Sequence, residues 1–395
     1  EKPASTETPA VTEKPVKEPD KAKTEQDSEK KEKEPEKKKE ETVLTSAGEF
    51  LCGGSRYAYA RLSEAEQIWY RDMEKILGNM AEKGQLSDEG LKKGLGTEHI
   101  DHIFQCIMID HPELFYVEGY VYNSYTYGGK LTSLEFSGSY SLSKEEALAR
   151  KKQIEEQARQ IVAGCPKGTD DYGKIRYVYE TLILRTDYRL DAPDNQNIYS
   201  VFVGRKSVCQ GYAKATQYLL NLLGVECTLV SGTVGSGTRH GWNLVRADGN
   251  YYYLDTTWGD ASYQPAEGSG VIAGLDINYD YLCVTTEELL RTHTIDSEVA
   301  MPACTAIADN YYVREGLFFY EADEERLRNL FAQADASKSY IVSLKCASKQ
   351  CYDQIFGMLI GESRIFEFYG IGAGSVAYIQ SEQQYSLTFW VTNAS

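Results

Sequence analysis

The spacing of hydrophobic residues along the chain predicts a mixture of helices and strands. In several segments apolar residues recur every three or four positions, which favours helices with one buried face. Two runs between these segments are rich in aromatic and β-branched residues, which favours strands. In the first half of the chain, helices are predicted at residues 63–77, 97–110, 143–162 and 170–184, and strands at 114–122 and 131–140. The first helix opens with Ser63 and Glu66 in a capping-box pattern.

A further helix is predicted directly after Cys209. Apolar residues recur at helical spacing from Tyr212 to Leu223, and Gly224 ends the run. A thiol at the start of a helix lies beside N–H groups without partners and at the positive end of the helix dipole. Both favour the thiolate, which is the nucleophilic form. The alternative is a structural cysteine, because free cysteines are among the most buried residue types.

A hairpin follows this helix, and it carries two residues that could serve a nucleophilic cysteine. Asp248 and Gly249 form a tight-turn signal between two strand-like runs. His240 lies at the mouth of the first strand and Asp255 ends the second, so the pairing places them within about two residues of each other. A carboxylate there can bind one imidazole nitrogen and leave the other to face Cys209.

The remaining four histidines are less suited to act as the base. His99 and His102 have the spacing of metal ligands on one helix face, but no third or fourth ligand accompanies them. His111 precedes a proline at a predicted helix end, and His293 is predicted near a helix C-terminus, where a cation is favoured. The nine cysteines form no C-x-x-C pair, which argues against a zinc site.

After about residue 310 the pattern becomes that of a small α+β domain of about 85 residues. Strands are predicted at residues 311–320, 339–345, 364–369, 375–380 and 385–391, and helices at 323–334 and 348–359. This part contains no histidine, so we expect a structural or partner-binding module. The predicted organisation is a tether at 1–42, a helical and hairpin region at 43–165, a catalytic core at 166–300 and an accessory domain at 301–395.

Composition and charge restrict the partners and the location. The formal net charge of −17 argues against nucleic acid, because phosphate contacts need clustered Lys and Arg. No apolar run approaches the ~20 residues of a membrane span. Residues 1–42 contain 11 Lys, 13 Asp or Glu and no aromatic residue, which predicts a disordered, extended tether. The chain starts at Glu1 and not at Met, which fits a product whose targeting segment has been removed.

Three blocks of residues resemble the transglutaminase-like superfamily, in particular its bacterial secreted or surface members. The blocks are Val208-Cys209-Gln210-Gly211-Tyr212-Ala213, His240-Gly241-Trp242-Asn243 and Asp255-Thr256-Thr257-Trp258. The resemblance covers residues 170–260 well and implies a papain-like Cys-His-Asp core, with N-terminal helices packed on an antiparallel sheet. It implies that Cys209 is the nucleophile, His240 the general acid and base, and Asp255 the residue that orients His240.

The resemblance also assigns roles around this triad. Gln196 matches a glutamine often found upstream of the cysteine block, and it is a candidate for an oxyanion hole together with the Cys209 N–H. Trp242 and Trp258 are candidates for the walls of the cleft, or else ordinary core aromatics. Gly241 departs from the family pattern, in which alanine is usual between the histidine and the tryptophan.

The function implied is cysteine-dependent acyl transfer on carboxamides of a protein or peptide, through an acyl-thioester on Cys209. The residues leave open whether water or an amine receives the acyl group, and therefore whether the enzyme is a protease, an amidase or a transamidase. No cofactor is expected. An extracellular or cell-surface location is expected, where a cell-wall component is a further candidate partner. The alternative is a non-catalytic surface interaction module that retains the fold.

Overall fold

The computed structural model of the protein describes residues 56–260, 275–370 and 375–392. The tether predicted at residues 1–42 lies outside these ranges, as does most of the loop predicted at 260–280. The described parts combine helices with mainly antiparallel sheets, in which only β4–β5 and β11–β12 pair in parallel, and this confirms the α+β class. None of the described helices is long and apolar enough to span a membrane.

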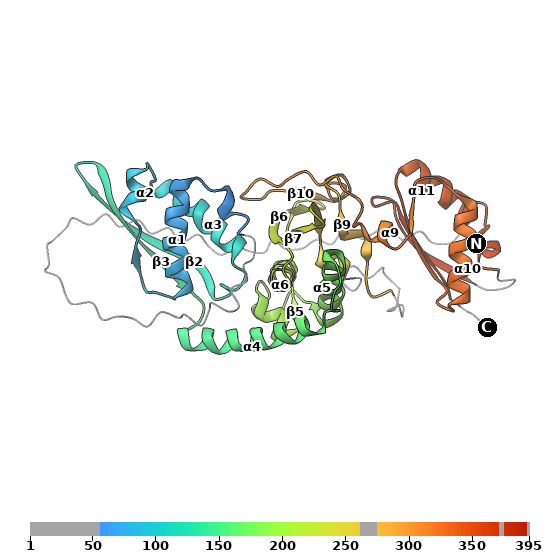
Figure 1. Ribbon diagram of the computed structural model, residues 1–395, viewed down its shortest axis with the longest axis horizontal. Coiled ribbons are helices and arrows are strands. Elements are labelled where there is room, and N and C mark those ends of the chain that lie inside the picture. Colours follow the sequence, from blue (N-terminus) through green and yellow to red (C-terminus); the bar gives the residue numbers. More distant parts are fainter. Residues whose placement is uncertain (1–55, 261–274, 371–374, 393–395) are drawn as a thin grey trace.

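The first described part is a small helical layer on a three-stranded antiparallel sheet in the order β1-β3-β2 (Figure 1). Its elements are η2 (Tyr59–Arg61), α1 (Glu64–Gly78), β1 (Gly84–Gln85), α2 (Asp88–Lys92), η3 (Thr97–His99), α3 (Ile100–Asp110), β2 (Val117–Tyr127) and β3 (Lys130–Tyr140). The capping box predicted at Ser63 and Glu66 is present, because each side chain accepts a hydrogen bond from the backbone N–H of the other residue. Two long helices follow, α4 (Lys144–Gly164) and α5 (Asp171–Arg185). Figure 1 shows α4 running along one side of the molecule, from this first part to the central part.

The central part packs helix α6 on a five-stranded antiparallel sheet in the order β10-β6-β7-β8-β9. Its elements are β4 (Asp187–Tyr188), η4 (Ser200–Gly204), β5 (Lys206–Ser207), α6 (Cys209–Leu222), β6 (Cys227–Val234), β7 (Thr238–Ala247), β8 (Asn250–Leu254), α7 (Thr256–Gly259), η5 (Tyr279–Tyr281), β9 (Leu282–Val284), α8 (Thr286–Leu289) and β10 (His293–Ile295). The buried Asn243 side chain of β7 donates a 2.9 Å hydrogen bond to Ala213 O of α6. This bond holds α6 at one position along the sheet.

The C-terminal part forms a second unit around a four-stranded sheet in the order β11-β12-β14-β13. Its elements are α9 (Tyr311–Arg314), β11 (Phe318–Phe319), α10 (Glu324–Ala336), β12 (Ile341–Cys346), α11 (Lys349–Phe356), η6 (Gly357–Gly361), α12 (Ile365–Phe368), β13 (Val376–Ser381) and β14 (Ser386–Val391). One predicted strand is wrong and one is only partly right. Residues 364–369 contain helix α12. Residues 311–320 begin with helix α9, which is capped by the Asn310 side chain, and only Phe318–Phe319 form a strand there.

Two hydrophobic cores organise the described residues. One runs from Tyr57 to Cys304 and joins the first part to the central part, so the predicted regions 43–165 and 166–300 share a core. Gln217 of α6 supports this junction with a 2.8 Å hydrogen bond to Ile109 O of α3. The second core lies within the C-terminal unit.

Buried polar groups join the C-terminal unit to the central part. Asp280 accepts hydrogen bonds from Tyr312 Oη at 2.9 Å and from Ser386 Oγ at 2.6 Å. Lys345 Nζ of β12 lies 2.9 Å from Glu288 Oε1 of α8. All of these side chains are buried, so each depends on its partner in the other unit for the hydrogen bond or counter-charge that water cannot supply there.

His111 gives a pH-dependent contribution to stability. It is buried with Nδ1 2.7 Å from Glu113 Oε1 and Nε2 3.2 Å from Glu74 Oε1. Burial lowers the pKa of His111, but the two carboxylates outweigh burial and raise the pKa to about 10. The stabilisation is therefore complete below the unfolded pKa of ~6.5 and is lost as pH rises towards 10.

We expect His111→Leu to lower the free energy of unfolding by about 2–3 kcal/mol at pH 6, because two partly buried carboxylates lose their cation. Urea unfolding of both proteins at pH 6 and pH 10 measures this. The difference should shrink at the higher pH. A difference that is equal at both values would contradict the assignment of a charged His111.

Candidate active site

Cys209 is the first residue of α6, as the sequence predicts. The helix N-cap is Val208, which makes no side-chain hydrogen bond to the first turn, and the first turn contains no acidic residue. The N–H groups around the sulfur are thus free of a side-chain cap, and no carboxylate of that turn opposes negative charge on the sulfur. The eight described cysteines are free thiols, and only Cys209 and Cys165 among them are not buried.

The hairpin brings His240 and Asp255 together. Strands β7 and β8 pair with Asn243 opposite Leu254, and Asp255 follows β8 directly. His240 Nε2 lies 2.7 Å from Asp255 Oδ2, with side-chain exposures of 2% and 1%. The predicted proximity of the two residues is confirmed.

The Asp255 carboxylate is held on both oxygens. Oδ1 accepts hydrogen bonds from Thr257 N at 2.9 Å and from Trp258 N at 3.1 Å, so Asp255 caps α7. Oδ2 lies close to His240 Nε2 and 3.0 Å from His293 Nε2. Burial raises the pKa of Asp255, but the two histidines outweigh burial and hold the pKa well below its usual range. Asp255 is therefore an ionised hydrogen-bond acceptor at neutral pH.

His240 carries a positive charge in this environment. Burial lowers the pKa of His240, but the charge of Asp255 and the hydrogen bonds to Asp255 and Cys209 raise the pKa to about 10. Because Nε2 contacts Asp255, Nδ1 is left to interact with the Cys209 side chain. The three predicted residues thus form a Cys-His-Asp chain, with the partly exposed residue Cys209 at one end and the buried Asp255 at the other.

Comparison with known proteins agrees with this geometry. Residues 155–256 match the family model of the transglutaminase-like superfamily. This part of the chain is therefore similar to a transglutaminase-like core. The match includes Cys209, His240 and Asp255, and it confirms the resemblance seen in the sequence. A search among curated proteins finds no match.

Solved structures resemble parts of the chain. A TGase is 14% identical over 40% of this chain and 52% of its own, with a TM-score of 0.26. The periplasmic domain of TgpA from Pseudomonas aeruginosa is 15% identical over 36% of this chain and 61% of its own, with a TM-score of 0.23. The chain therefore spans little more than half the length of the first and about three fifths of the second.

One histidine that the sequence did not connect to the site lies outside the matched residues 155–256. His293 follows α8, as expected, but it starts strand β10 and pairs with Val234 of β6. The expectation of a cation there is wrong, because burial is the largest influence and lowers the pKa of His293. No local pattern around residue 293 predicts the contact with Asp255, which depends on pairing between distant segments.

The two tryptophans predicted to line the cleft differ in exposure. Trp242 is fully buried, and its ring stacks behind His240 with ring centroids 5.9 Å apart. Trp258 is partly exposed, with its ring centroid 6.2 Å from that of His240. The two indoles pack near the imidazole, and of the two only Trp258 is partly exposed.

Two glutamines lie near the start of α6. The backbone beside Gln196 is tied to this start, because Val208 N donates to Asn195 O at 3.1 Å. A methyl group added at Gly241 would lie 3.1 Å from Gln210 Nε2, so the Gln210 amide covers the backbone next to His240. Sequence analysis assigns Gln210 no role. An alanine at position 241 would press on this amide.

Hydrogen bonds, and not a metal ion, explain the cluster around Asp255. Donor atoms of His240, Asp255 and His293 lie within 4.8 Å of one another, the only such group found among the described residues. The nitrogen–oxygen distances are 2.7 and 3.0 Å. Two ligands of one tetrahedral zinc ion, each ~2.1 Å from it, lie roughly 3.4 Å apart. The shorter spacing fits direct hydrogen bonds.

The histidines with metal-ligand spacing are also engaged in hydrogen bonds. His99 Nδ1 accepts from Gly96 N at 3.1 Å, and His102 Nδ1 lies 2.5 Å from Glu298 Oε1. His99 therefore binds nearby backbone, and His102 binds a carboxylate that is distant in the sequence.

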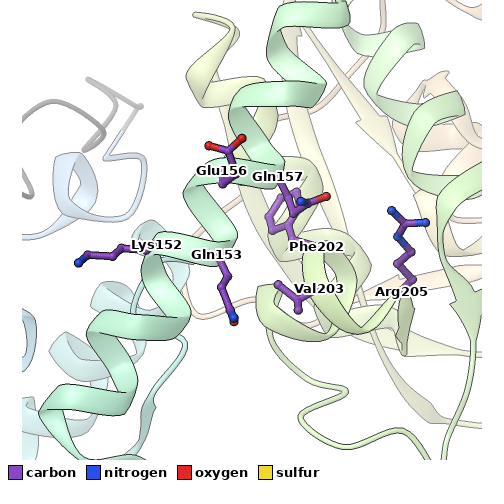
Figure 2. A pocket seen from close by; sticks show the side chains of 7 residues that line it. All are labelled: Lys152, Gln153, Glu156, Gln157, Phe202, Val203 and Arg205. Carbon is purple, nitrogen blue, oxygen red and sulfur yellow. The ribbon is translucent and has the colours of Figure 1, made fainter.

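A pocket of about 550 Å³ lies between α4 and η4. Figure 2 shows its lining residues, which are Lys152, Gln153, Glu156, Gln157, Phe202, Val203 and Arg205. None of them is a predicted site residue, and the Lys152 side chain points away from the others. The pocket lining thus includes none of Cys209, His240 and Asp255.

Proposed function

We propose that the protein is a cysteine-dependent acyl-transfer enzyme that acts on carboxamides of proteins or peptides through an acyl-thioester on Cys209. The observation that supports this is the chain from the partly exposed residue Cys209 through His240 to the buried, ionised Asp255. The superfamily match over residues 155–256 supports the same class of chemistry.

The proposed reaction uses two displacements at one carbonyl carbon. The Cys209 thiolate attacks this carbon, and the C–N bond breaks as His240 gives its Nδ1 proton to the leaving ammonia or amine. The acyl group then remains as a thioester on Cys209. Water or a primary amine attacks the thioester, His240 takes its proton, and the C–S bond breaks to restore the thiolate. Asp255 keeps the imidazole in the required orientation throughout.

The oxyanion of each tetrahedral intermediate needs hydrogen-bond donors. The Cys209 N–H at the uncapped start of α6 is one candidate, and the Gln196 side-chain amide is the second.

We expect Gln196→Ala to lower kcat by about 10²–10³-fold with little change in KM, because the donor acts on the transition state. Steady-state hydrolysis of p-nitrophenyl acetate measures both constants. Gln157→Ala, a matched change in the pocket of Figure 2, should leave both unchanged. Equal kinetics for the two variants would remove Gln196 from the oxyanion hole.

The identity of the acyl acceptor can be tested directly. The protein is incubated with a glutamine-bearing peptide and a labelled primary amine, and the products are identified by mass spectrometry. Amine incorporation means transamidation, ammonia loss without incorporation means deamidation, and chain cleavage means proteolysis. If no product depends on Cys209, the proposal is wrong.

The alternative of a non-catalytic surface module predicts an ordinary thiol at position 209. The rate of alkylation by iodoacetamide would then rise only around pH ~8.5, the pKa of a free thiol. Alkylation that is already rapid at pH 6 supports the enzyme, because only a thiolate reacts at a useful rate.

We propose an extracellular or cell-surface location, where a cell-wall component could be a partner. The support is the composition of residues 1–42, in which 11 Lys and 13 Asp or Glu accompany no aromatic residue. Such sequences form extended tethers. Fractionation of cells that produce the native protein would test this location, and recovery of the protein in the cytoplasm would refute it.

A further inference from the structure

A second histidine contacts the Asp255 carboxylate. His293 Nε2 lies 3.0 Å from Asp255 Oδ2, the same oxygen that lies 2.7 Å from His240 Nε2. Pairing of His293 with Val234 fixes its position at the end of the five-stranded sheet. The exposures of His293, His240 and Asp255 are 2%, 4% and 1%, so solvent does not compete for these bonds.

One arrangement of hydrogens fits the closest contacts of His293. Asp255 is ionised and can only accept, so the hydrogen lies on His293 Nε2. Burial lowers the pKa of His293, so at neutral pH the ring is uncharged and Nδ1 has no hydrogen. Thr292 Oγ1 lies 2.8 Å from Nδ1 and can donate to it, while Leu289 O, at 3.3 Å, is the more distant partner of this hydroxyl. The Thr292 hydroxyl therefore favours the tautomer that donates to Asp255.

We propose that His293 is a positioning residue, held in one tautomer by Thr292, that fixes the Asp255 carboxylate for its interaction with His240. This inference rests on the proposed function, in which His240 serves Cys209. Two effects follow. The second donor prevents rotation of the carboxylate away from His240. It also shares the carboxylate charge between two imidazoles, so His240 is less basic than it would be with Asp255 to itself.

Titratable groups from several elements face this pair. They are Cys209 of α6, His240 of β7, Asp255 ahead of α7, Tyr179 of α5 and Tyr281 beside β9. Burial raises the pKa of both tyrosines far above the neutral range, so they stay uncharged. The protonation of His240 therefore responds to Cys209, Asp255 and the donor from His293.

Longer contacts extend from Thr292 towards the C-terminal unit. Tyr281 Oη lies 3.4 Å from Thr292 Oγ1, and Gln384 Nε2 lies 3.5 Å from Tyr281 Oη. Gln384 is buried and also donates to Glu288 O at 3.2 Å. The C-terminal unit thus packs directly behind the residues that hold His293.

The test compares His293→Leu, which removes the donor, with His293→Gln, whose amide N–H can replace it. Imidazole ¹⁵N NMR follows the protonation of His240 with pH, and hydrolysis of p-nitrophenyl acetate gives kcat and KM. In His293→Leu we expect the His240 titration to move up by roughly 0.5–1 pH unit, and kcat to fall by about 10–100-fold at unchanged KM. His293→Gln should restore most of both values.

Thr292→Val tests the tautomer in a protein that keeps both histidines. It should shift the His240 titration in the same direction as His293→Leu, whereas Thr294→Val, the same change at an exposed position of β10, should not. If His293→Leu and Thr292→Val both leave the His240 titration at its wild-type position, the inference is overturned. The NMR measurement needs no turnover, so it decides this point even if the wild-type protein shows no Cys209-dependent reaction and the proposed function fails.

Discussion

Replacement of Cys209 by alanine is expected to abolish formation of the acyl-enzyme. With p-nitrophenyl acetate, the wild-type protein should release about one equivalent of p-nitrophenolate in a rapid burst as the thioester forms. The Cys209→Ala variant should show no burst, and its kcat should fall by about 10⁴–10⁶-fold, as expected when a covalent nucleophile is lost. Stopped-flow absorbance measures both the burst and the later steady rate.

The control for this experiment is the other described thiol that is not buried. Cys165 follows α4, and its pKa is raised by burial, so it should react slowly. Cys165→Ala should keep the burst and should keep stoichiometric labelling by iodoacetamide at pH 6. If Cys209→Ala still gives a stoichiometric burst or label, another cysteine is the nucleophile and the proposed function is wrong.

The site could be predicted from the sequence where its geometry is local. A helix that begins at Cys209 and a hairpin with a two-residue turn each follow from short-range patterns. The hairpin register then places His240 beside Asp255 without knowledge of the rest of the chain. The transglutaminase-like blocks add roles to residues whose proximity was already expected.

The rest of the site depends on contacts between distant segments. His293 reaches Asp255 because the three-residue strand β10 pairs with β6, and so short a strand has no recognisable alternation. The sequence also does not predict whether Trp242 is buried or lines the cleft. Every β7 residue from His240 to Val245 is buried, so the strand shows no alternation of apolar and polar faces there. With both faces of the strand covered, alternation no longer separates core from cleft.

The wrong strand of the C-terminal unit has a similar cause. The segment around Ile365 and Phe368 is aromatic and β-branched, which favours a strand by composition. These two residues are nevertheless buried three positions apart on one side of helix α12, where they face the core that includes Phe331. Tertiary packing therefore decided the conformation against the local preference.

A buried ion pair between Lys345 and Glu288 links the C-terminal unit to the central part. Lys345 and Glu288 have side-chain exposures of 1% and 10%, and their charged atoms lie 2.9 Å apart. Burial raises the pKa of Glu288, but Lys345 and the hydrogen bonds from Thr285 outweigh burial and lower it. Glu288 is therefore ionised at neutral pH and depends on Lys345 for its counter-charge.

We expect Lys345→Met to lower the free energy of unfolding by about 3–5 kcal/mol at pH 7, because a buried carboxylate loses its cation. The folded pKa of Glu288 is depressed, so the stabilisation is present above the unfolded value of ~4.3 and is lost as pH falls through the folded value. Urea unfolding at pH 7 and at pH 3.5, followed by far-UV circular dichroism, should show a large difference from wild type at the first pH and a smaller one at the second.

Two variants separate the buried charge from other effects of the substitution. Lys349→Met makes the same change at an exposed pair with Asp353 in the same unit, and its unfolding midpoint should match wild type. Glu288→Gln combined with Lys345→Met removes the orphaned charge, so part of the lost stability should return. If Lys345→Met alone is as stable as wild type at pH 7, the pair does not hold the C-terminal unit against the core, and the support that this unit gives to Thr292 and His293 must come from Asp280 and Gln384 instead.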